Sequence, residues 1–165
     1  MPNRNSPKHL ISEHGFATVY KNTQTGQNWF CSNGNFAPND VISPFSAASI
    51  FDEPTYLTVQ VDDNKHITLS PDHLKNTNHS CDPNALFDTT TMQLTCLRDI
   101  KAGDEITFFY PSSEWEMTQS FGCHCGSPQC LGQINGAYHL SLFHLRQYRL
   151  TDFIRRKIKE TADLI

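Results

Sequence analysis

The 165-residue sequence has no long apolar run, and no window approaches the length of a membrane-spanning helix. Residues 1–8 are polar, contain two prolines and lack the apolar core of a secretory signal. Basic residues are not in excess, since 13 Lys and Arg stand against 17 Asp and Glu, for a formal net charge of −4. We therefore expect no membrane contact and no direct nucleic-acid binding. A soluble intracellular protein, cytoplasmic or nuclear, is the expectation.

Apolar residues make up only 38% of the chain, but they include eleven Phe and five Tyr. This composition is typical of a globular protein rich in irregular structure, and it excludes a wholly disordered chain. The sequence contains no internal repeat and no low-complexity segment. A length of 165 residues fits one domain with one core. The composition does not indicate an oligomeric state.

Short β-prone runs dominate the pattern of the chain. Residues 16–20 and 29–31 flank a polar turn that contains glycine, and together they predict a β-hairpin. Residues 56–61 alternate between apolar and polar side chains and predict a strand. Further short strands are predicted near residues 41–42, 67–69, 92–96 and 106–110. For residues 43–54 we expect a loop with at most one helical turn.

One helix is predicted, at the C-terminal end of the sequence. Thr151 is a suitable N-cap, and Ile154, Ile158 and Ile165 fall near one helical face. Basic residues over 155–159 occupy the other faces, and we interpret them as a solvated surface rather than a contact for nucleic acid or membrane. The predicted fold class is mainly β, with short strands, long connections and a terminal helix.

Three of the six cysteines lie within eight residues of one another, at Cys123, Cys125 and Cys130. Such clustering favours an intracellular metal site over a disulfide framework, which would spread its cysteines more evenly. Zinc prefers four tetrahedral ligands, and a closed thiolate site stabilises a segment that is too short and polar to fold on its own core. A redox thiol protein is a weaker alternative, because the spacing suits coordination better than thiol exchange.

The stretch Asn-His-Ser-Cys-Asp-Pro-Asn, residues 78–84, is too polar to be core packing. Pro83 restricts φ and Asn84 tolerates unusual backbone angles, so the stretch predicts a tight bend. Cys81 lies in this bend and is the expected fourth zinc ligand, with His124 as a competitor. The two remaining thiols lie in predicted strands, where a buried thiol acts as a small hydrophobic group, at Cys31 and Cys96.

Three stretches, in this order, resemble the SET-domain protein lysine methyltransferases that carry a cysteine-rich post-SET segment: residues 78–84, 103–110 and 123–132. The resemblance extends from about Ser12 to Ala137. It implies a SET-domain fold of several short-stranded sheets, with a knot-like crossing of the first two stretches, a post-SET zinc segment and a terminal helix. The implied divisions are a polar tail over 1–11, a SET domain over 12–117, a post-SET segment over 118–137 and a helical extension over 138–165.

The resemblance implies an S-adenosylmethionine-dependent protein lysine N-methyltransferase, acting on a histone H3-like or other basic protein tail. Tyr110 matches the catalytic tyrosine, which orients the methyl group and the amine but, with an ordinary phenol pKa of about 10, is no strong base. Phe108 matches a position where phenylalanine leaves more room than tyrosine, so we expect di- or trimethylation. Tyr56 either forms another wall of the aromatic lysine channel or packs in the sheet.

The resemblance also implies a set of residues that contact S-adenosylmethionine: His14, Gly15, Phe16, Asn78, His79, Tyr110 and Ile134. The first glycine of the family's Gly-x-Gly is replaced here by Glu13, and Lys75-Asn76-Thr77 stands where an apolar residue usually precedes the Asn-His pair. The segment between Tyr56 and Asn78 is very short, so the substrate is not carried over from the family. The alternative hypothesis is a catalytically silent, zinc-containing interaction module with the same fold.

Overall fold

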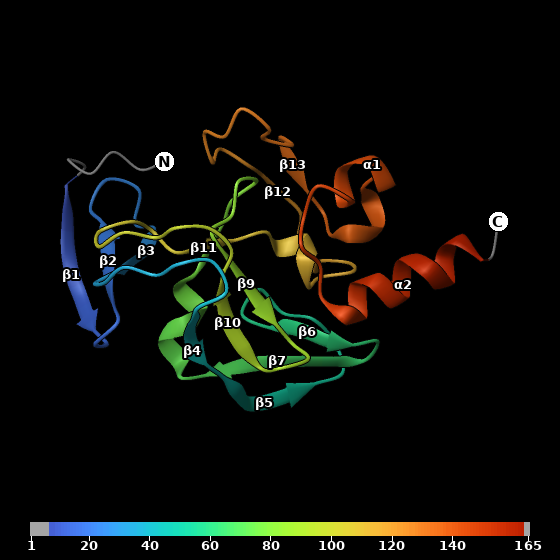
Figure 1. Cartoon of the computed structure of the whole chain (residues 1–165), viewed down its shortest axis with the longest axis horizontal. Helices are drawn as coiled ribbons and strands as arrows, with labels where there is room; N and C mark the ends of the chain where they lie inside the picture. Colours follow the sequence, from blue (N-terminus) through green and yellow to red (C-terminus); the bar gives the residue numbers. More distant parts are fainter. Residues whose placement is uncertain (1–6, 164–165) are drawn as a thin grey trace.

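The structure is a computed structural model that describes residues 7–163. This part of the chain contains thirteen short strands, three 3₁₀ turns and two helices, and the strands form four small sheets. Figure 1 shows β1 to β3 at one end of the molecule and α1 and α2 at the other, with the sheet that contains β8 to β11 between them. The predicted mainly β fold class is confirmed.

The first sheet is an antiparallel meander of β1 (Lys8–Glu13), β2 (Ala17–Asn22) and β3 (Asn28–Ser32). The predicted hairpin over β2 and β3 is confirmed. Its turn is held by the Asn22 side chain, whose Oδ1 accepts hydrogen bonds from the backbone N–H groups of Gln24 and Thr25 at 2.8 and 3.1 Å. The expected tail over 1–11 lies mostly outside the described residues, and its residues 8–11 belong to β1.

The second sheet has five strands in the order β4-β10-β9-β11-β8. They are β4 (Val41–Pro44), β8 (Asn78–His79), β9 (Ala85–Asp88), β10 (Gln93–Cys96) and β11 (Thr107–Phe108). Strand β11 runs parallel between β8 and β9, and it pairs Thr107 with Asn78 and Phe108 with both His79 and Ala85. Residues 107–108 therefore lie between β8, at the start of the 78–84 bend, and β9, which directly follows it. The knot-like threading stays a prediction.

Two of the strands predicted for this sheet are shorter than expected. The strand predicted over 106–110 ends at Phe108, because a 3₁₀ turn, η2, begins at Tyr110 (Tyr110–Ser112). Pro111 has no N–H to extend the ladder. The strand predicted over 92–96 starts at Gln93, because Met92 has φ 56° and lies in the preceding turn.

The third sheet contains β5 (Ser46–Phe51), β6 (Val59–Asp62) and β7 (Lys65–Ser70), in the order β5-β7-β6, and η1 (Asp72–Asn76) follows it. The loop expected over 43–54 is wrong, because β5 pairs along β7. All six of its residues are exposed, so it lacks an alternating pattern. The strand predicted over 56–61 is also wrong at its start. The Thr58 N–H and hydroxyl both donate to the Thr55 carbonyl, at 3.2 and 3.0 Å, which keeps residues 55–58 in a turn.

The C-terminal part contains β12 (Phe121–Gly122), β13 (Gln133–Ile134), η3 (Ala137–His139), α1 (Leu142–Leu145) and α2 (Asp152–Ala162). The predicted N-cap of α2 is confirmed, because the Thr151 side chain accepts a hydrogen bond from the Ile154 N–H. Ile165, predicted for the apolar face of this helix, lies outside the described residues. None of the helices within residues 7–163 is long and apolar enough to cross a membrane.

The basic face of α2 is more ordered than a purely solvated surface. Arg156 forms ion pairs with Asp62 and Asp63, and Lys157 pairs with Asp63 at 2.6 Å. Because Asp62 is the last residue of β6 and Asp63 follows it in the turn to β7, these contacts tie the C-terminal helix to the third sheet. Arg155, Arg156 and Lys159 are exposed, as expected for a solvated surface, and the ion pairs add contacts within the protein to it.

The main core lies between the first three sheets. Its largest fully buried side chains come from β3, β7, β9, β10 and the segments between strands, and include Phe30, Ile67, Leu74, Phe87, Leu94, Ile100 and Ile106. Cys96 belongs to this core and is 0% exposed, and Cys31 is 6% exposed, as predicted for apolar thiols. A smaller cluster joins Ile154 of α2 to Ala137, Leu145 and Phe153. A third cluster packs Ile134 against Cys81 and Cys123.

Candidate active site

Two cavities of different character meet at Tyr110. We call the first the polar cleft. It encloses about 650 Å³ and is lined by amide, carboxylate, imidazole and thiol side chains that include Asn22, Asn78, His79, Asp82, Glu105, Cys123 and Cys125. We call the second the apolar cavity. It encloses about 190 Å³ and is lined mostly by aliphatic and aromatic side chains, with four Thr, Lys75, Glu114 and Gln119 among them. Tyr110 and Phe121 line both.

Hydrogen bonds from the 78–84 bend hold the strand that leads to Tyr110. The Asn84 side chain accepts a bond from the Thr107 N–H at 2.9 Å and donates to the Glu105 carbonyl at 2.8 Å. The Ser80 N–H donates to the Phe108 carbonyl at 3.0 Å. The polar 78–84 bend thus supplies hydrogen-bond partners for backbone groups of residues 105–108. Because the 78–84 bend begins with Asn78 and His79, the strand that it holds brings Tyr110 next to these two residues.

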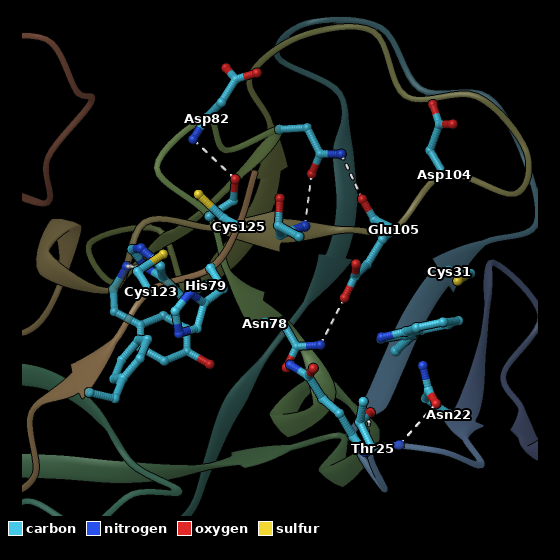
Figure 2. A pocket seen from close by; sticks show the side chains of 18 of the residues that line it. Asn22, Thr25, Cys31, Asn78, His79, Asp82, Asp104, Glu105, Cys123 and Cys125 are labelled. Carbon is cyan, nitrogen blue, oxygen red and sulfur yellow. Dashed lines mark hydrogen bonds between the residues drawn. The ribbon is translucent and has the colours of Figure 1, made fainter. Parts of the chain in front are cut away.

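Asn78 anchors a partly buried carboxyl group in the polar cleft. Its Nδ2 donates to the Glu105 carboxylate at 2.7 Å and to the Asn28 carbonyl at 2.6 Å. Burial raises the pKa of Glu105, and the hydrogen bond from Asn78 partly opposes that rise. Figure 2 shows Asn78 and Glu105 between His79, Cys123 and Cys125 on one side of the cleft and Asn22, Thr25 and Cys31 on the other.

His79 connects Tyr110 to the thiols. Its Nδ1 lies 3.2 Å from the Tyr110 N–H and accepts a hydrogen bond from it, so the neutral ring carries its proton on Nε2. That Nε2 lies 3.3 Å from the Cys81 Sγ. Burial lowers the pKa of His79 to about 4, which keeps the ring neutral near pH 7. The imidazole is therefore a fixed structural connection with one defined tautomer.

The Tyr110 side chain is held as a neutral phenol. Its hydroxyl donates to the Thr77 carbonyl at 3.4 Å, so the unusual Lys75-Asn76-Thr77 stretch supplies a backbone acceptor. Burial, together with smaller contributions from the charges of Glu105 and Glu114, raises the pKa of Tyr110 to about 12. A group with this pKa can orient a reactant by hydrogen bonding. It is poorly suited to removing a proton from one.

The structure brings Cys81, Cys123, Cys125 and Cys130 together, with all four sulfur atoms within 4.8 Å of one another. The Cys81 and Cys123 sulfurs are 3.9 Å apart. Four ligands at tetrahedral Zn–S bonds of about 2.3 Å would place sulfur atoms about 3.8 Å apart, so the donor set and spacing fit zinc. His124, the predicted competitor, is exposed and lies outside the cluster.

The C-terminal extension also contacts the bend that carries Cys81. The Tyr148 hydroxyl donates to the Cys81 carbonyl at 3.0 Å, and the Tyr148 ring stacks on Phe109 with 3.7 Å between centroids. Phe109 precedes Tyr110, so one aromatic side chain supports both the bend and the start of η2. This contact links the extension to the junction of the two cavities.

The apolar cavity contains both residues predicted for a lysine channel, Tyr56 and Phe108. Phe108 is 6% exposed, and its ring centroid lies 4.6 Å from that of Tyr110 and 4.8 Å from that of Phe87. Tyr56 is 87% exposed and belongs to the 55–58 turn rather than to a strand. The two side chains therefore line the cavity at very different depths.

The sequence matches the SET domain family over residues 8–111. The chain belongs to the SET-domain family. This finding confirms the predicted family, and the matched range includes Asn78, His79 and Tyr110. It ends before Cys123, so the match does not include the three C-terminal cysteines of the thiol cluster.

Several curated proteins are similar to this SET domain. The methyltransferase flvH of Aspergillus flavus is 43% identical over 103 residues, which cover 61% of this chain and 57% of that protein. An H3 lysine-36 specific histone-lysine N-methyltransferase of Schizosaccharomyces pombe is 40% identical over 65 residues, or 36% of this chain and 8% of that protein. The histone-lysine N-methyltransferase set9 of the same yeast is 42% identical over 69 residues, or 41% and 15%. The chain thus spans less than two thirds of each relative.

Four of the residues predicted to contact the cofactor line neither cavity: His14, Gly15, Phe16 and Ile134. Gly15 has φ 69° in the turn after β1, a conformation that favours glycine. His14 stacks on His73 at 3.8 Å, and Phe16 packs against Phe30. Ile134 is fully buried behind the thiols, in a cluster with Cys81 and Cys123. Their cofactor contacts stay predictions.

Our interpretation of the sequence missed Glu105, Glu114, Phe121 and Tyr148 as residues of this SET-domain site. Glu105 lay inside a matched motif but was given no role. Glu114 had one local signal, because it follows eight uncharged residues, 106–113, and precedes Trp115. An isolated acid in such a stretch indicates a buried carboxyl group that needs partners. The contacts of Tyr148 carry no local signal.

Proposed function

We propose that this SET domain transfers a methyl group from S-adenosylmethionine to the side-chain amine of a protein lysine. The observation that carries the proposal is the meeting of the polar cleft and the apolar cavity at Tyr110. The polar cleft suits a charged nucleoside-containing cofactor, and the narrower apolar cavity suits an alkyl stem that ends in an amine. A reaction between the two molecules requires such a junction.

The bound cofactor supplies an electrophilic methyl group on a sulfonium. The residues around Tyr110 align the incoming amine with that methyl group, which lowers the entropic part of the barrier. The walls of the apolar cavity remove water from the amine and so favour its neutral form. The aromatic rings of Phe108 and Tyr110 also attract a methylammonium product through their π faces. Because the side chain at position 108 is Phe, we propose that the enzyme adds a second or third methyl group.

We further propose that Cys81, Cys123, Cys125 and Cys130 hold a structural zinc ion. The four thiols offer the donor type and spacing that zinc prefers. Such a site joins the 78–84 bend to the cysteine segment, whose Phe121, Cys123 and Cys125 line the polar cleft. The metal therefore shapes one wall of the cofactor site.

The proposed substrate is a lysine in a basic protein tail. Support comes from the names of two relatives, which are histone-lysine N-methyltransferases. A protein substrate of this kind agrees with an intracellular location that includes the nucleus, and with a chain of net charge −4 that binds no nucleic acid directly.

A second candidate function is a silent interaction module that keeps the SET fold. Two observations favour it: Glu13 replaces the first glycine of the cofactor loop, and residues 14–16 line neither cavity. In that case the polar cleft would be a remnant without affinity for the cofactor.

The two functions are separated by calorimetry on the zinc-loaded protein. We expect S-adenosylmethionine to bind, and a radiolabelled methyl group to be transferred to members of a panel of lysine-containing basic peptides or to proteins of a cell extract. Tyr110→Phe should keep cofactor binding and lower transfer by about 100-fold, because the hydroxyl acts in alignment. Absence of cofactor binding would exclude the enzyme, and equal transfer by Tyr110→Phe would exclude the role given to that hydroxyl.

A further inference from the structure

Glu114 is the one acidic residue among those that line the apolar cavity. It is 7% exposed. The other titratable lining side chains are Tyr56, Lys75 and Tyr110, and Lys75 already pairs with Asp72 at 2.8 Å. Glu114 forms no ion pair with another described residue, which is unusual for a buried acid because a buried charge is costly unless it is paired.

The backbone around Glu114 holds its carboxyl group in place. One carboxylate oxygen, Oε1, accepts a hydrogen bond from the Gln60 N–H at 2.8 Å. In return the Gln60 side-chain oxygen accepts a bond from the Trp115 N–H at 2.9 Å. The Glu114 N–H donates to the Tyr110 carbonyl at 3.0 Å, so the carboxyl group is tied to the residue that joins the two cavities.

The charge state of Glu114 is strongly perturbed. Burial raises the pKa of Glu114 to about 8, although hydrogen bonds from the Gln60 N–H and from Ser113 act in the opposite direction. The charge of Glu114 is also the smallest of the contributions that raise the pKa of Tyr110, after burial and Glu105. Among residues 7–163, no cationic side chain contributes to the Glu114 pKa. A cation that entered the cavity would supply the missing partner.

We propose that Glu114 binds the ammonium group of the substrate lysine and accepts one of its protons. This inference rests on the proposed methyltransferase function and adds a residue to it. One N–H bond of the ammonium breaks, its electron pair stays on nitrogen, and the proton goes to the Glu114 carboxylate. The neutral amine then forms the N–C bond to the methyl group while the C–S electron pair returns to sulfur. A methylammonium and a neutral thioether result, so charge and atoms balance.

Transfer of this proton is favoured by the surroundings. In an apolar cavity, a neutral amine beside a neutral carboxylic acid avoids the desolvation cost of two buried charges. The neutral phenol of Tyr110 remains free to orient the amine. The proposal thus assigns proton acceptance and alignment to two different side chains, Glu114 and Tyr110.

A purely structural role is the competing explanation, since Glu114 also connects β6 to the segment after η2 through Gln60. Glu114→Gln distinguishes the two, because the amide oxygen can still accept the Gln60 N–H bond while the negative charge is removed. Glu116→Gln is the matched control. It removes a carboxylate that is 64% exposed and lies 3.7 Å from His139, far less buried than Glu114.

The test measures binding of n-pentylammonium, a lysine side chain without its backbone, and of n-pentanol, its neutral analogue, by NMR titration. For the wild type, affinity for pentylammonium should rise by about tenfold per pH unit up to about pH 8, because the carboxyl group must lose its proton to bind. It should then level off, since the ammonium keeps its charge to about pH 10.4. Glu114→Gln should bind pentylammonium at least about tenfold more weakly at pH 8, and its affinity should no longer depend on pH. Its affinity for pentanol should stay the same. Glu116→Gln should behave as wild type.

The proposal is overturned if Glu114→Gln weakens pentylammonium and pentanol equally, or if wild-type affinity for pentylammonium does not change with pH. A second readout uses wild-type protein alone, in case the variant fails to fold. Pentylammonium should shift the pH titration of the Glu114 carboxyl carbon resonance, and an unchanged titration would also overturn the proposal. Neither measurement needs S-adenosylmethionine, so a failure of cofactor binding refutes the enzyme without altering these results.

Discussion

The polar cleft and the apolar cavity differ in how their buried carboxyl groups are satisfied. Glu105, in the polar cleft, receives a hydrogen bond from Asn78 within the protein. Glu114, in the apolar cavity, is bonded to the Gln60 N–H and has a pKa raised to about 8. Both carboxyl groups thus accept a hydrogen bond from the protein, Glu105 from a side-chain amide and Glu114 from a backbone N–H, and burial raises the pKa of both. The difference lies in their surroundings, because Glu105 lines the polar cleft and Glu114 lines the apolar cavity, where we propose that a cation binds.

The largest effect is expected from Cys81→Ser, which should damage the polar cleft and spare the apolar cavity. Loss of one thiolate should release the metal and lower the free energy of unfolding by several kcal/mol, because metal binding contributes to folding. Affinity for S-adenosylmethionine should fall by about tenfold or more, whereas pentanol binding should persist. Metal analysis, urea unfolding and calorimetry measure the three quantities.

The matched control for that experiment is Cys96→Ser. Cys96 is equally buried, but its sulfur donates to the Arg98 carbonyl at 2.9 Å and a serine hydroxyl can do the same. Metal content should stay at about one ion per chain. If Cys81→Ser also retained the metal and its cofactor affinity, the assignment of Cys81 would be wrong.

The next effect concerns the pH dependence of stability and sharpens the difference between the two acids. The pKa of Glu114 is raised from 4.5 to about 8 in the folded protein, so between these values the folded state holds a proton that the unfolded state has lost. Stability from this group is therefore present at low pH and falls as pH rises, by about 1.4 kcal/mol per pH unit. Glu114→Gln should remove that slope in urea unfolding experiments. Parallel curves for the two proteins would contradict the buried, unpaired carboxyl group.

A smaller effect is expected from Phe108→Tyr, which changes the apolar cavity alone. The added hydroxyl narrows the space beside Tyr110, whose ring lies 4.6 Å away. Di- and trimethylated products should drop by about tenfold relative to monomethylated product, a difference of about 1.4 kcal/mol, with cofactor affinity unchanged. Mass spectrometry of a methylated peptide measures the ratio of these products. Monomethyl product alone from the wild type would refute the role of Phe108.

The smallest effect is expected from Arg156→Ala, which lies outside both cavities. Arg156 is 44% exposed where it pairs with Asp63 at 3.1 Å and Glu160 at 2.9 Å. Surface ion pairs of this kind contribute about 1 kcal/mol or less, even in a small network. Urea unfolding should show a loss within that limit, and binding of both S-adenosylmethionine and pentylammonium should not change. A change in either affinity would show that α2 is coupled to the cavities.

Local sequence signals were enough for several elements. The polar turn between β2 and β3, the N-cap Thr151 and the cysteine cluster over 123–130 each follow from residues that are neighbours in the chain. The bend at 78–84 is of the same kind, and the matched motifs placed Tyr110 beside it. These features were predictable because the physical cause and its effect lie within a few residues.

The tertiary structure decided what distant segments do together. Strand β5 is exposed along its whole length and forms because β7 offers a partner, and Tyr56 leaves its predicted strand because Thr55 and Thr58 bond to each other. The Glu114 carboxyl group is held by a hydrogen bond from the Gln60 N–H, which lies 54 residues earlier in the chain. Composition and the order of the motifs were enough to predict a SET domain in which four thiols converge. Packing and hydrogen bonds between remote residues form the two different cavities beside Tyr110. They also set the pKa values of the residues that line them, because desolvation depends on the completed packing and not on neighbours in the sequence.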